Sequence, residues 1–265
     1  MGASVVVLCR DNPCQLEETL SSLVLATQGL EPPFALELLV LDGSKTEACH
    51  KVFDAAALQP WKRRLIPRPP QGIYDAMNAA LREVSGSWVA FMNAGDLYVA
   101  GGLALLLLHA EAITATPGLH RPAAVFGQAW VEPPGWSLRW LTPDPAMNHL
   151  ECWLNHMVPC HQSMLFSVDF ARLHPYPLNS GTKADRMVMR AALDPAPKQV
   201  YVAKPVCRYR LGGQSSRLVA WTSLTAENLR PGERLGEYLK VVLSPFRVGY
   251  PLLMWVRSRW FGWIC

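Results

Sequence analysis

The stretch between residues 66 and 96 constrains the fold of this chain more than any other. Three prolines and Gly72 interrupt regular structure at its start. Apolar residues at helical spacing then predict a helix over residues 73–84. Residues 88–92 are a short apolar run between turn residues, which is typical of a strand buried on both faces. The turn Asn93-Ala-Gly-Asp96 follows at the carboxyl end of this strand, where open α/β sheets bind their ligands.

Strand and helix patterns alternate along the rest of the chain up to residue 211. Such alternation predicts βαβ units and an α/β fold with a mainly parallel central sheet. Residues 132–147 are rich in proline and tryptophan and are predicted to form a long loop. In the first helix we expect Leu16, Leu20, Leu23 and Val24 to face inward. The other strands are predicted at residues 4–8, 36–41, 64–66, 123–130, 162–166, 200–203 and 206–211, and the other helices at residues 16–25, 48–57, 102–113, 168–172 and 185–193.

The composition excludes several classes of protein. Of the 265 residues, 50% are hydrophobic and 17% are charged, which is enough apolar material for a folded domain and unlike a disordered tail. A net charge of +4 without a basic, aromatic-rich stripe argues against a nucleic-acid partner. Seven scattered cysteines without a C-x-x-C pair are typical of free thiols in a reducing cytosol. With neither a secretory signal nor an apolar run of about 20 residues, we expect a cytoplasmic protein.

The character of the sequence changes near residue 217, so we predict a domain over residues 1–216 and an extension over residues 217–265. The extension mixes aromatic and arginine side chains, a combination that favours a membrane interface. We therefore expect it to bind the cytoplasmic face of the inner membrane. The alternative is that its apolar residues pack onto the domain or onto a second subunit, because Pro245 and Pro251 break any long helix.

Two motifs stand in a fixed order in the central stretch. Gly72-Ile-Tyr-Asp-Ala-Met-Asn78 opens the predicted helix, and Met92-Asn-Ala-Gly-Asp96 ends the following strand. Leu41-Asp-Gly-Ser-Lys-Thr46 ends an earlier strand, and Tyr209-Arg-Leu-Gly-Gly-Gln-Ser215 lies at the end of the last one. Together they resemble the bacterial family 2 glycosyltransferases of polysaccharide, capsule and colanic acid synthesis. The resemblance implies a Rossmann-like GT-A fold and transfer, with inversion, from a nucleotide-sugar donor to a saccharide or lipid-linked acceptor.

Asp96 is implied by the resemblance to be the metal ligand, for Mn²⁺ or Mg²⁺. A divalent cation stabilises negative charge on a leaving nucleoside diphosphate, and it prefers hard oxygen ligands. The acidic run of the family is incomplete here at Asn93 and Gly95. One carboxylate remains, so we expect weak metal binding without the nucleotide. The alternative is that Asp96 caps a helix that starts near Gly101.

The resemblance also implies a set of donor-binding residues. Asp42 would contact the base or ribose. Arg10 departs from the family, many of whose members have a small or aromatic residue at this position, and we assign it to the phosphates on its charge. Asp75, Asn78 and Asn93 complete the set, and the first two share a helix face because they are three residues apart. The alternatives are that Asp42 is an ordinary turn aspartate before glycine, and that Asp75 complements the helix dipole in the first turn.

On the acceptor side, the resemblance implies that Asp185 is the general base, which takes the proton of the attacking hydroxyl. His161 and Gln162 would line the same side. The alternative for Asp185 is the N-cap of a helix over residues 186–193.

Other interpretations compete with this one. A non-catalytic sugar-nucleotide-binding or scaffold protein fits the degenerate metal motif. A dinucleotide-dependent oxidoreductase fits the α/β pattern but requires a G-x-G-x-x-G after the first strand, which this chain lacks. Zinc is a candidate at Cys152, His156, Cys160 and His161, although their C-x3-H-x3-C-H spacing matches no standard zinc pattern.

Overall fold

The computed structural model describes residues 2–30, 34–58, 60–69, 71–118, 121–133, 139–142, 159–193 and 200–211, with backbone only for residues 181–183. The strands are β1 (Gly2–Cys9), β2 (Ala35–Asp42), β3 (Lys62–Pro67), β4 (Trp88–Asn93), β5 (Leu97–Tyr98), β6 (Ala124–Glu132), β7 (Trp140–Leu141), β8 (Met164–Ser167) and β9 (Tyr201–Arg210). The helices are α1 (Pro13–Ala26), α2 (Ala48–Ala55), α3 (Ile73–Glu83), α4 (Gly102–Ala115), α6 (Val168–Leu173) and α7 (Ala184–Leu193), with 3-10 turns η1 (His161–Ser163) and η2 (Leu178–Lys183).

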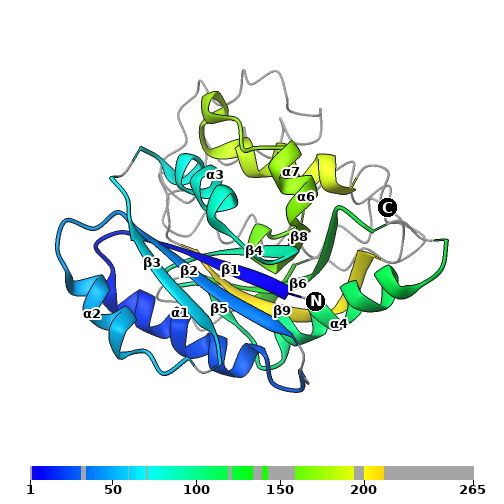
Figure 1. Cartoon of the computed structure of the whole chain (residues 1–265), viewed down its shortest axis with the longest axis horizontal. Helices are drawn as coiled ribbons and strands as arrows, with labels where there is room; N and C mark the ends of the chain where they lie inside the picture. The colour runs from blue at the N-terminus through cyan, green and yellow to red at the C-terminus, as the bar shows by residue number, and fades with distance from the viewer. Residues whose placement is uncertain are drawn as a thin grey trace.

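The described strands form one nine-stranded sheet in the order β3-β2-β1-β4-β8-β6-β9-β5, with β7 paired to β6 (Figure 1). β3, β2, β1 and β4 pair in parallel. β8 is antiparallel to both β4 and β6, and β9 is parallel to β6, so β6 and β9 run in the same direction as β1. The prediction of an α/β fold with a mainly parallel sheet is confirmed.

Helices cover both faces of this sheet (Figure 1). Alternate residues of β1 point to opposite faces, as the pleat of a strand requires. Val5 and Val7 pack in one apolar core with α1, α2 and α4, whereas Val6 and Leu8 pack in a second core with α3, α6 and α7. The central strands are thus buried on both sides, which explains why they read as continuous apolar runs.

Several predicted elements differ in detail from the structure. Val24 is 52% exposed, although the prediction placed it inward. Helical spacing allowed both Leu23 and Val24 on the apolar face, and the inward stripe of α1 is only wide enough for Leu23. The predicted loop over residues 132–147 contains the short strand β7, because Trp140 pairs with Val131. The start of the predicted strand at residues 162–166 belongs instead to the 3-10 turn η1.

The last two predicted strands are a single strand, β9. Its pairing with β6 shifts register around Gln128, which lies opposite Pro205. Proline cannot donate to a sheet ladder and is tolerated at such a bulge. From the sequence alone, the proline at this bulge was interpreted as a break between two strands.

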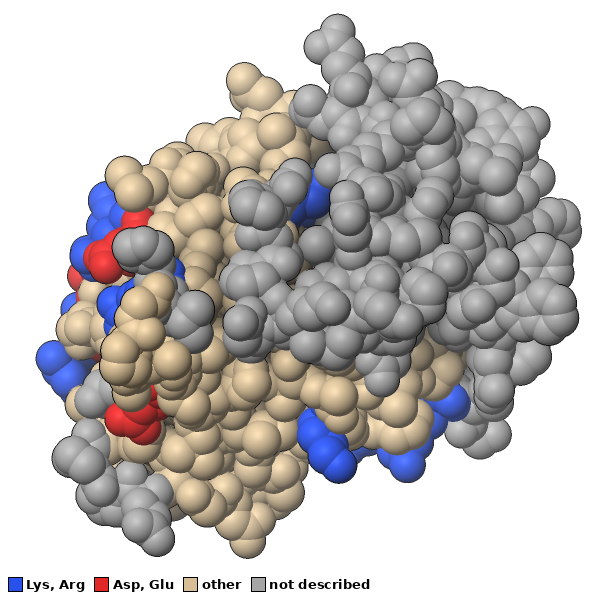
Figure 2. Space-filling model, turned by 90° about the vertical axis from the view of Figure 1, so that its right-hand side faces the viewer, with Lys and Arg blue, Asp and Glu red and all other residues tan. Residues whose placement is uncertain are grey.

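The described cysteines, Cys9, Cys14, Cys49, Cys160 and Cys207, are all free thiols, as predicted. On the face drawn in Figure 2, the described lysine and arginine side chains lie in separate small groups. Among the described helices, none combines the length and the apolar character needed to cross a bilayer. The extension at 217–265 and the end of the Tyr209–Ser215 motif lie outside the described residues.

Candidate active site

The carboxyl ends of three parallel strands meet at one edge of the sheet. Cys9 at the end of β1 pairs with Asp42 at the end of β2. On the other side of β1, Leu8 pairs with Asn93 at the end of β4. The register therefore brings Asp42 and Asn93 to the same edge, one strand apart, as the sequence predicted for the strand ends.

The turn after β4 is held by a side chain from α1. The Thr19 hydroxyl donates to the Asp96 carbonyl oxygen over 2.9 Å and accepts from the Gly95 backbone N–H over 2.9 Å. Gly95 has a φ of 106°, a region that L side chains rarely adopt. Asp96 does not cap the next helix, because α4 is capped by Gly101. The capping alternative is therefore wrong.

Asp96 is a buried carboxylate, 4% exposed. Its Oδ1 accepts from the Arg210 backbone N–H over 3.1 Å, and its Oδ2 lies 3.4 Å from Asn93 Nδ2. Burial raises the pKa of Asp96 from 3.8 to about 7, and hydrogen bonds from Arg210, Asn93 and Gln162 oppose that rise. Asn93 Oδ1 is also buried and has no hydrogen-bond partner within the described chain. The Asn93 amide thus meets Asp96 through its nitrogen, and its oxygen keeps no partner among the described residues at the same strand end.

Asp42 uses both of its oxygens within the protein. Its Oδ1 accepts from the Cys9 thiol over 3.3 Å and from the Ser44 N–H over 2.9 Å, and its Oδ2 lies 3.3 Å from His50 Nε2. The bond from Ser44 is that of a turn aspartate, so the alternative for Asp42 describes part of its role. Arg10 is not drawn into this group, since its side chain is 53% exposed and pairs with Asp11 at 3.8 Å.

The two predicted donor-binding residues of α3, Asp75 and Asn78, each bond a neighbouring segment. Arg68 donates to the Asp75 carboxylate over 2.6 Å and 3.1 Å, while the Arg68 backbone N–H donates to the Asp42 carbonyl oxygen. Asp75 is thus linked to the edge that carries Asp42. The Asn78 amide bonds both the N–H and the C=O of Tyr176, each over 2.8 Å, so it ties α3 to the segment after α6.

A second group surrounds Asp185. α7 begins at Ala184, which places Asp185 inside the first turn, so the N-cap alternative is wrong. Tyr74 lies beside Asp185, and burial followed by the Asp185 charge raises the pKa of Tyr74. The Tyr74 and Tyr176 rings stack at 5.7 Å, and the Tyr176 hydroxyl lies 2.8 Å from His161 Nε2.

The two groups are adjacent through η1. Gln162 lies beside Asp96 and opposes the rise of its pKa, and its neighbour His161 is hydrogen-bonded to Tyr176 in the group around Asp185. The structure therefore places most of the predicted site residues at or near the same edge of the sheet. Four lie at the strand ends and beside Asp96: Asp42, Asn93, Asp96 and Gln162. Four more lie around them, Asp75, Asn78, His161 and Asp185, whereas the side chain of Arg10 is not part of this group.

Comparison with known proteins identifies the family. The model of glycosyl transferase family 2 matches residues 4–172, which include the strand ends and the Asp96 turn. The chain belongs to this family. Over 213 residues it is 30% identical to a PGL/p-HBAD biosynthesis glycosyltransferase of Mycobacterium bovis and to its counterpart in Mycobacterium tuberculosis, covering 78% of this chain and 77% of those proteins. Its activity class is sugar transfer, as the resemblance implied.

Solved structures share the fold of this family 2 glycosyltransferase. S. aureus TarS 1–349 in complex with UDP superposes with a TM-score of 0.60 at 14% identity, covering 93% of this chain and 72% of that one. The mannosyltransferase PcManGT from Pyrobaculum calidifontis, in complex with GDP-Man and Mn²⁺, gives a TM-score of 0.56 at 15% identity, covering 98% and 75%. The GT-A fold expected from the motifs is confirmed.

Two residues of the candidate site were not predicted from the sequence. Tyr74 stands inside the Gly72–Asn78 motif, where it reads as one more residue of an amphipathic helix. Tyr176 follows α6 in a stretch without periodicity. It is separated from its partner Asn78 by 98 residues in the sequence, so no local pattern reveals their contact. Of the zinc candidates, Cys160 donates to Gln162 and His161 is bonded to Tyr176, while Cys152 and His156 lie outside the described residues.

Proposed function

We propose that this protein is an inverting, metal-dependent hexosyltransferase, which moves a sugar from a nucleotide-sugar donor to a saccharide or lipid-linked acceptor in cell-surface polysaccharide synthesis. One observation carries the proposal. The buried Asp96 carboxylate and Asn93 Oδ1, which has no partner among the described residues, lie together at the end of β4, one strand away from the strand end that carries Asp42. Two hard oxygens at the ligand-binding edge of an α/β sheet suit a cation and the phosphates that it accompanies.

The chemistry of these donors fits a divalent cation. Asp96 supplies a carboxylate oxygen and Asn93 an amide oxygen, which is the donor set that Mg²⁺ and Mn²⁺ prefer over softer ligands. When bound, such a cation stabilises negative charge on the leaving nucleoside diphosphate. The complexes of TarS with UDP-GlcNAc and of PcManGT with GDP-Man and Mn²⁺ support a nucleotide-sugar donor and a divalent cation. With one carboxylate, cation affinity is low until the diphosphate adds its own oxygens.

On the donor side, Asp42 receives the base or ribose. Asp75 and Asn78 hold their positions near it through Arg68 and the Tyr176 backbone. Arg10 is exposed at the same strand end, where it can reach a phosphate. Arg68 joins this set, because its guanidinium stands beside Asp75 and its backbone N–H bonds Asp42.

On the acceptor side, Asp185 is the general base. The acceptor oxygen attacks the anomeric carbon, the bond from that carbon to the diphosphate oxygen breaks, and the Asp185 carboxylate takes the hydroxyl proton. Attack from the side opposite the leaving group inverts the anomeric centre. The Tyr74 hydroxyl orients the carboxylate, and His161 and Gln162 extend from this group toward Asp96.

Variants of Asp185 test this assignment. Asp185→Asn should fold normally and bind donor but lose transfer, since the amide cannot take a proton. Asp169→Asn is the matched control, because Asp169 is also an aspartate at the start of a helix and its side chain is 82% exposed. Transfer at near-normal rate in Asp185→Asn would remove it from the mechanism.

The competing function is a sugar-nucleotide binder without catalysis, which the single carboxylate of the metal motif keeps under consideration. A panel of UDP- and GDP-sugars with Mn²⁺ or Mg²⁺ separates the two, by thermal shift for binding and by release of nucleoside diphosphate for turnover. The proposed enzyme releases the diphosphate in a cation-dependent reaction that Asp96→Asn abolishes. Binding without any such release would favour the scaffold function.

We further propose that transfer takes place at the cytoplasmic face of the membrane, with residues 1–216 as the catalytic domain and residues 217–265 as the membrane-binding extension. The support is the mixture of aromatic and arginine side chains in that extension. A chain truncated before Val241 should lose binding to anionic vesicles in a flotation assay. Equal flotation of the truncated and full chains would contradict the membrane role.

A further inference from the structure

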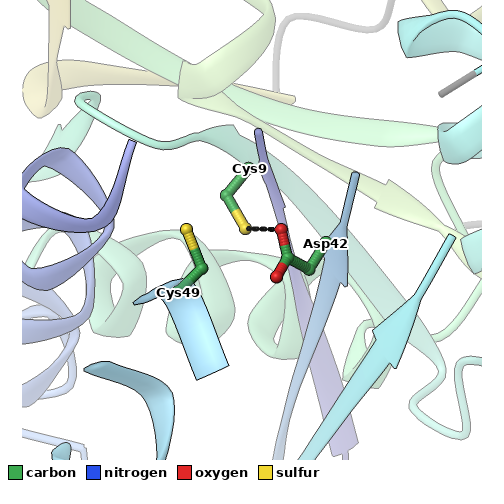
Figure 3. A group of neighbouring side chains, drawn as sticks. All are labelled: Cys9, Asp42 and Cys49. Carbon is green, nitrogen blue, oxygen red and sulfur yellow. Dashed lines mark hydrogen bonds between the residues drawn. The ribbon is translucent and has the colours of Figure 1, made fainter. Parts of the chain in front are cut away.

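Two cysteines and a carboxylate converge beneath the edge of the sheet that the donor set occupies. Cys9 is the last residue of β1, Asp42 is the last residue of β2, and Cys49 lies in the first turn of α2. All three are buried, at 7%, 3% and 0% exposure. One ligand atom from each lies within 4.8 Å of the other two, and Figure 3 shows the sulfurs and the carboxylate close together, with the bond from Cys9 to Asp42 dashed.

Neighbouring groups hold this cluster from outside. The Ser44 hydroxyl donates to Cys49 Sγ over 3.3 Å, and the Ser44 backbone N–H donates to Asp42 Oδ1 over 2.9 Å. His50 Nε2 lies 3.3 Å from Asp42 Oδ2, the oxygen that Cys9 does not use. Hydrogen bonds that orient potential ligands in this way are a regular feature of protein metal sites.

We propose that Cys9, Asp42 and Cys49 bind a thiophilic divalent cation of the Zn²⁺ type, at a site separate from Asp96. With metal–ligand bonds of roughly 2.0–2.3 Å, the ligand atoms of a tetrahedral zinc site lie about 3.5 Å apart. The 3.3 Å between Cys9 Sγ and Asp42 Oδ1, and the 4.8 Å limit for the group, need only small side-chain rotations to reach that spacing.

The donor types select the ion. Two sulfurs favour Zn²⁺ over Mg²⁺ or Mn²⁺, whereas the oxygens of Asn93 and Asp96 favour Mg²⁺ or Mn²⁺ over Zn²⁺. Binding displaces the two thiol protons, which are released to solvent. Three protein ligands leave one tetrahedral position for a non-protein ligand. The chain thus offers a soft site and a hard site at neighbouring strand ends.

A consequence for transfer rests on the proposed function. Asp42 is the carboxylate assigned there to the base or ribose of the donor. A cation that takes an Asp42 oxygen removes it from donor recognition, so Zn²⁺ at this site inhibits transfer in competition with the nucleotide sugar. The same ion does not replace the cation at Asp96, because the two sites share no ligand.

Zinc titration of the full chain tests the site without any donor. The protein is reduced, stripped with a chelator and titrated with Zn²⁺ against a chromophoric competitor. We expect one equivalent to bind in the wild type and in the control Cys14→Ala, whose thiol is exposed on α1. Cys9→Ala and Cys49→Ala should each weaken that affinity by roughly 100-fold or more, and His50→Ala by roughly tenfold through the lost bond to Asp42. Circular dichroism checks that each variant folds.

Cobalt substitution gives a second measurement. One equivalent of Co²⁺ should produce a thiolate-to-metal charge-transfer band in the near ultraviolet, with about half its intensity left in Cys49→Ser, a size-matched variant that keeps the site filled. Wild-type protein that binds no equivalent of Zn²⁺, or a Cys49 variant that binds it as the wild type does, would overturn the proposal. Because no donor is present, these outcomes are independent of whether the protein transfers sugar.

Discussion

The Tyr176 hydroxyl and His161 Nε2 lie 2.8 Å apart in the buried layer beside β4. Phe91 touches both rings, with centroid distances of 5.7 Å to each. Burial lowers the pKa of His161, and the Asp185 charge opposes that change to a smaller extent. The imidazole is therefore neutral at pH 7, so it orients Tyr176 through a hydrogen bond without forming an ion pair with Asp185.

Removing the Tyr176 hydroxyl tests this bond. Tyr176→Phe leaves a buried imidazole nitrogen without its partner, so we expect a loss of about 1–3 kcal/mol in the free energy of unfolding. Tyr98→Phe is the matched control, because the Tyr98 hydroxyl is buried and has no partner within the described residues. That control should be neutral or slightly stabilising. Urea unfolding at pH 7 measures both, and equal stabilities for the two variants would contradict the assignment.

Tyr74 positions the proposed base. Tyr74→Phe removes the hydroxyl beside Asp185 and keeps the ring stacked on Tyr176. We expect kcat to fall about tenfold with little change in KM for the donor, because an oriented base contributes roughly 10²–10⁴-fold and this variant only loosens its orientation. Steady-state kinetics with the donor found by the panel measure the effect. A change confined to KM would assign Tyr74 to donor binding instead.

Local pattern was sufficient for the half of the sheet that builds the site. β1, β2 and β4 are apolar runs ending in polar turns, and parallel pairing then brings Asp42 and Asn93 to one edge whatever the remaining details are. The same pattern failed at Val24, since spacing alone does not tell how wide a helix face is covered. The prediction also split β9 into two strands at Pro205, because a proline at a β-bulge and a proline at a strand end give the same sequence pattern.

The contacts that complete the site depend on residues far apart in the chain. Cys9 is hydrogen-bonded to Asp42, which is 33 residues away in the sequence, and Asn78 is hydrogen-bonded to Tyr176, which is 98 residues away. Contacts over such separations produce no periodic pattern in the sequence. The cluster of Cys9, Asp42 and Cys49 and the pair of Tyr74 and Tyr176 can therefore be recognised only in the folded structure. The motifs singled out Asp42, Asp96 and Asp185 as candidate site residues, but they did not predict that Asp96 is buried or that Asn93 Oδ1 has no partner among the described residues.

Thr19 should control the shape of the turn at residues 93–96, where we propose that the cation binds. Thr19→Val keeps the volume but leaves the Gly95 N–H and the Asp96 C=O without the hydroxyl that bonds them. We expect a loss of about 1–3 kcal/mol in stability and weaker cation dependence of transfer. Thr114→Val is the control, because the Thr114 hydroxyl only bonds a carbonyl oxygen within its own helix. Thermal unfolding and cation titration of turnover measure the two effects, and identical behaviour of both variants would show that the turn does not need Thr19.

Asp96 should make the metal-free protein less stable as the pH rises. Its folded-state pKa is raised to about 7 from 3.8, mainly by burial, so between these values the folded state keeps a proton that the unfolded state has lost. The stability supplied by this group is complete below about pH 4 and is lost as the pH rises through 7. Asp96→Asn removes that loss, and we expect the variant to be about 2–4 kcal/mol more stable than the wild type at pH 8.5, with a much smaller difference at pH 5.

Urea unfolding in the presence of EDTA at these two pH values measures the difference. Asp169→Asn is the control for a general effect of charge, since the Asp169 side chain is 82% exposed and its variant should show no such pH dependence. The gain in stability should accompany a loss of cation-dependent transfer, because the carboxylate whose burial destabilises the fold is the one proposed to bind the cation. An Asp96→Asn variant that is no more stable than the wild type at pH 8.5 would show that the carboxylate is not desolvated as the structure implies.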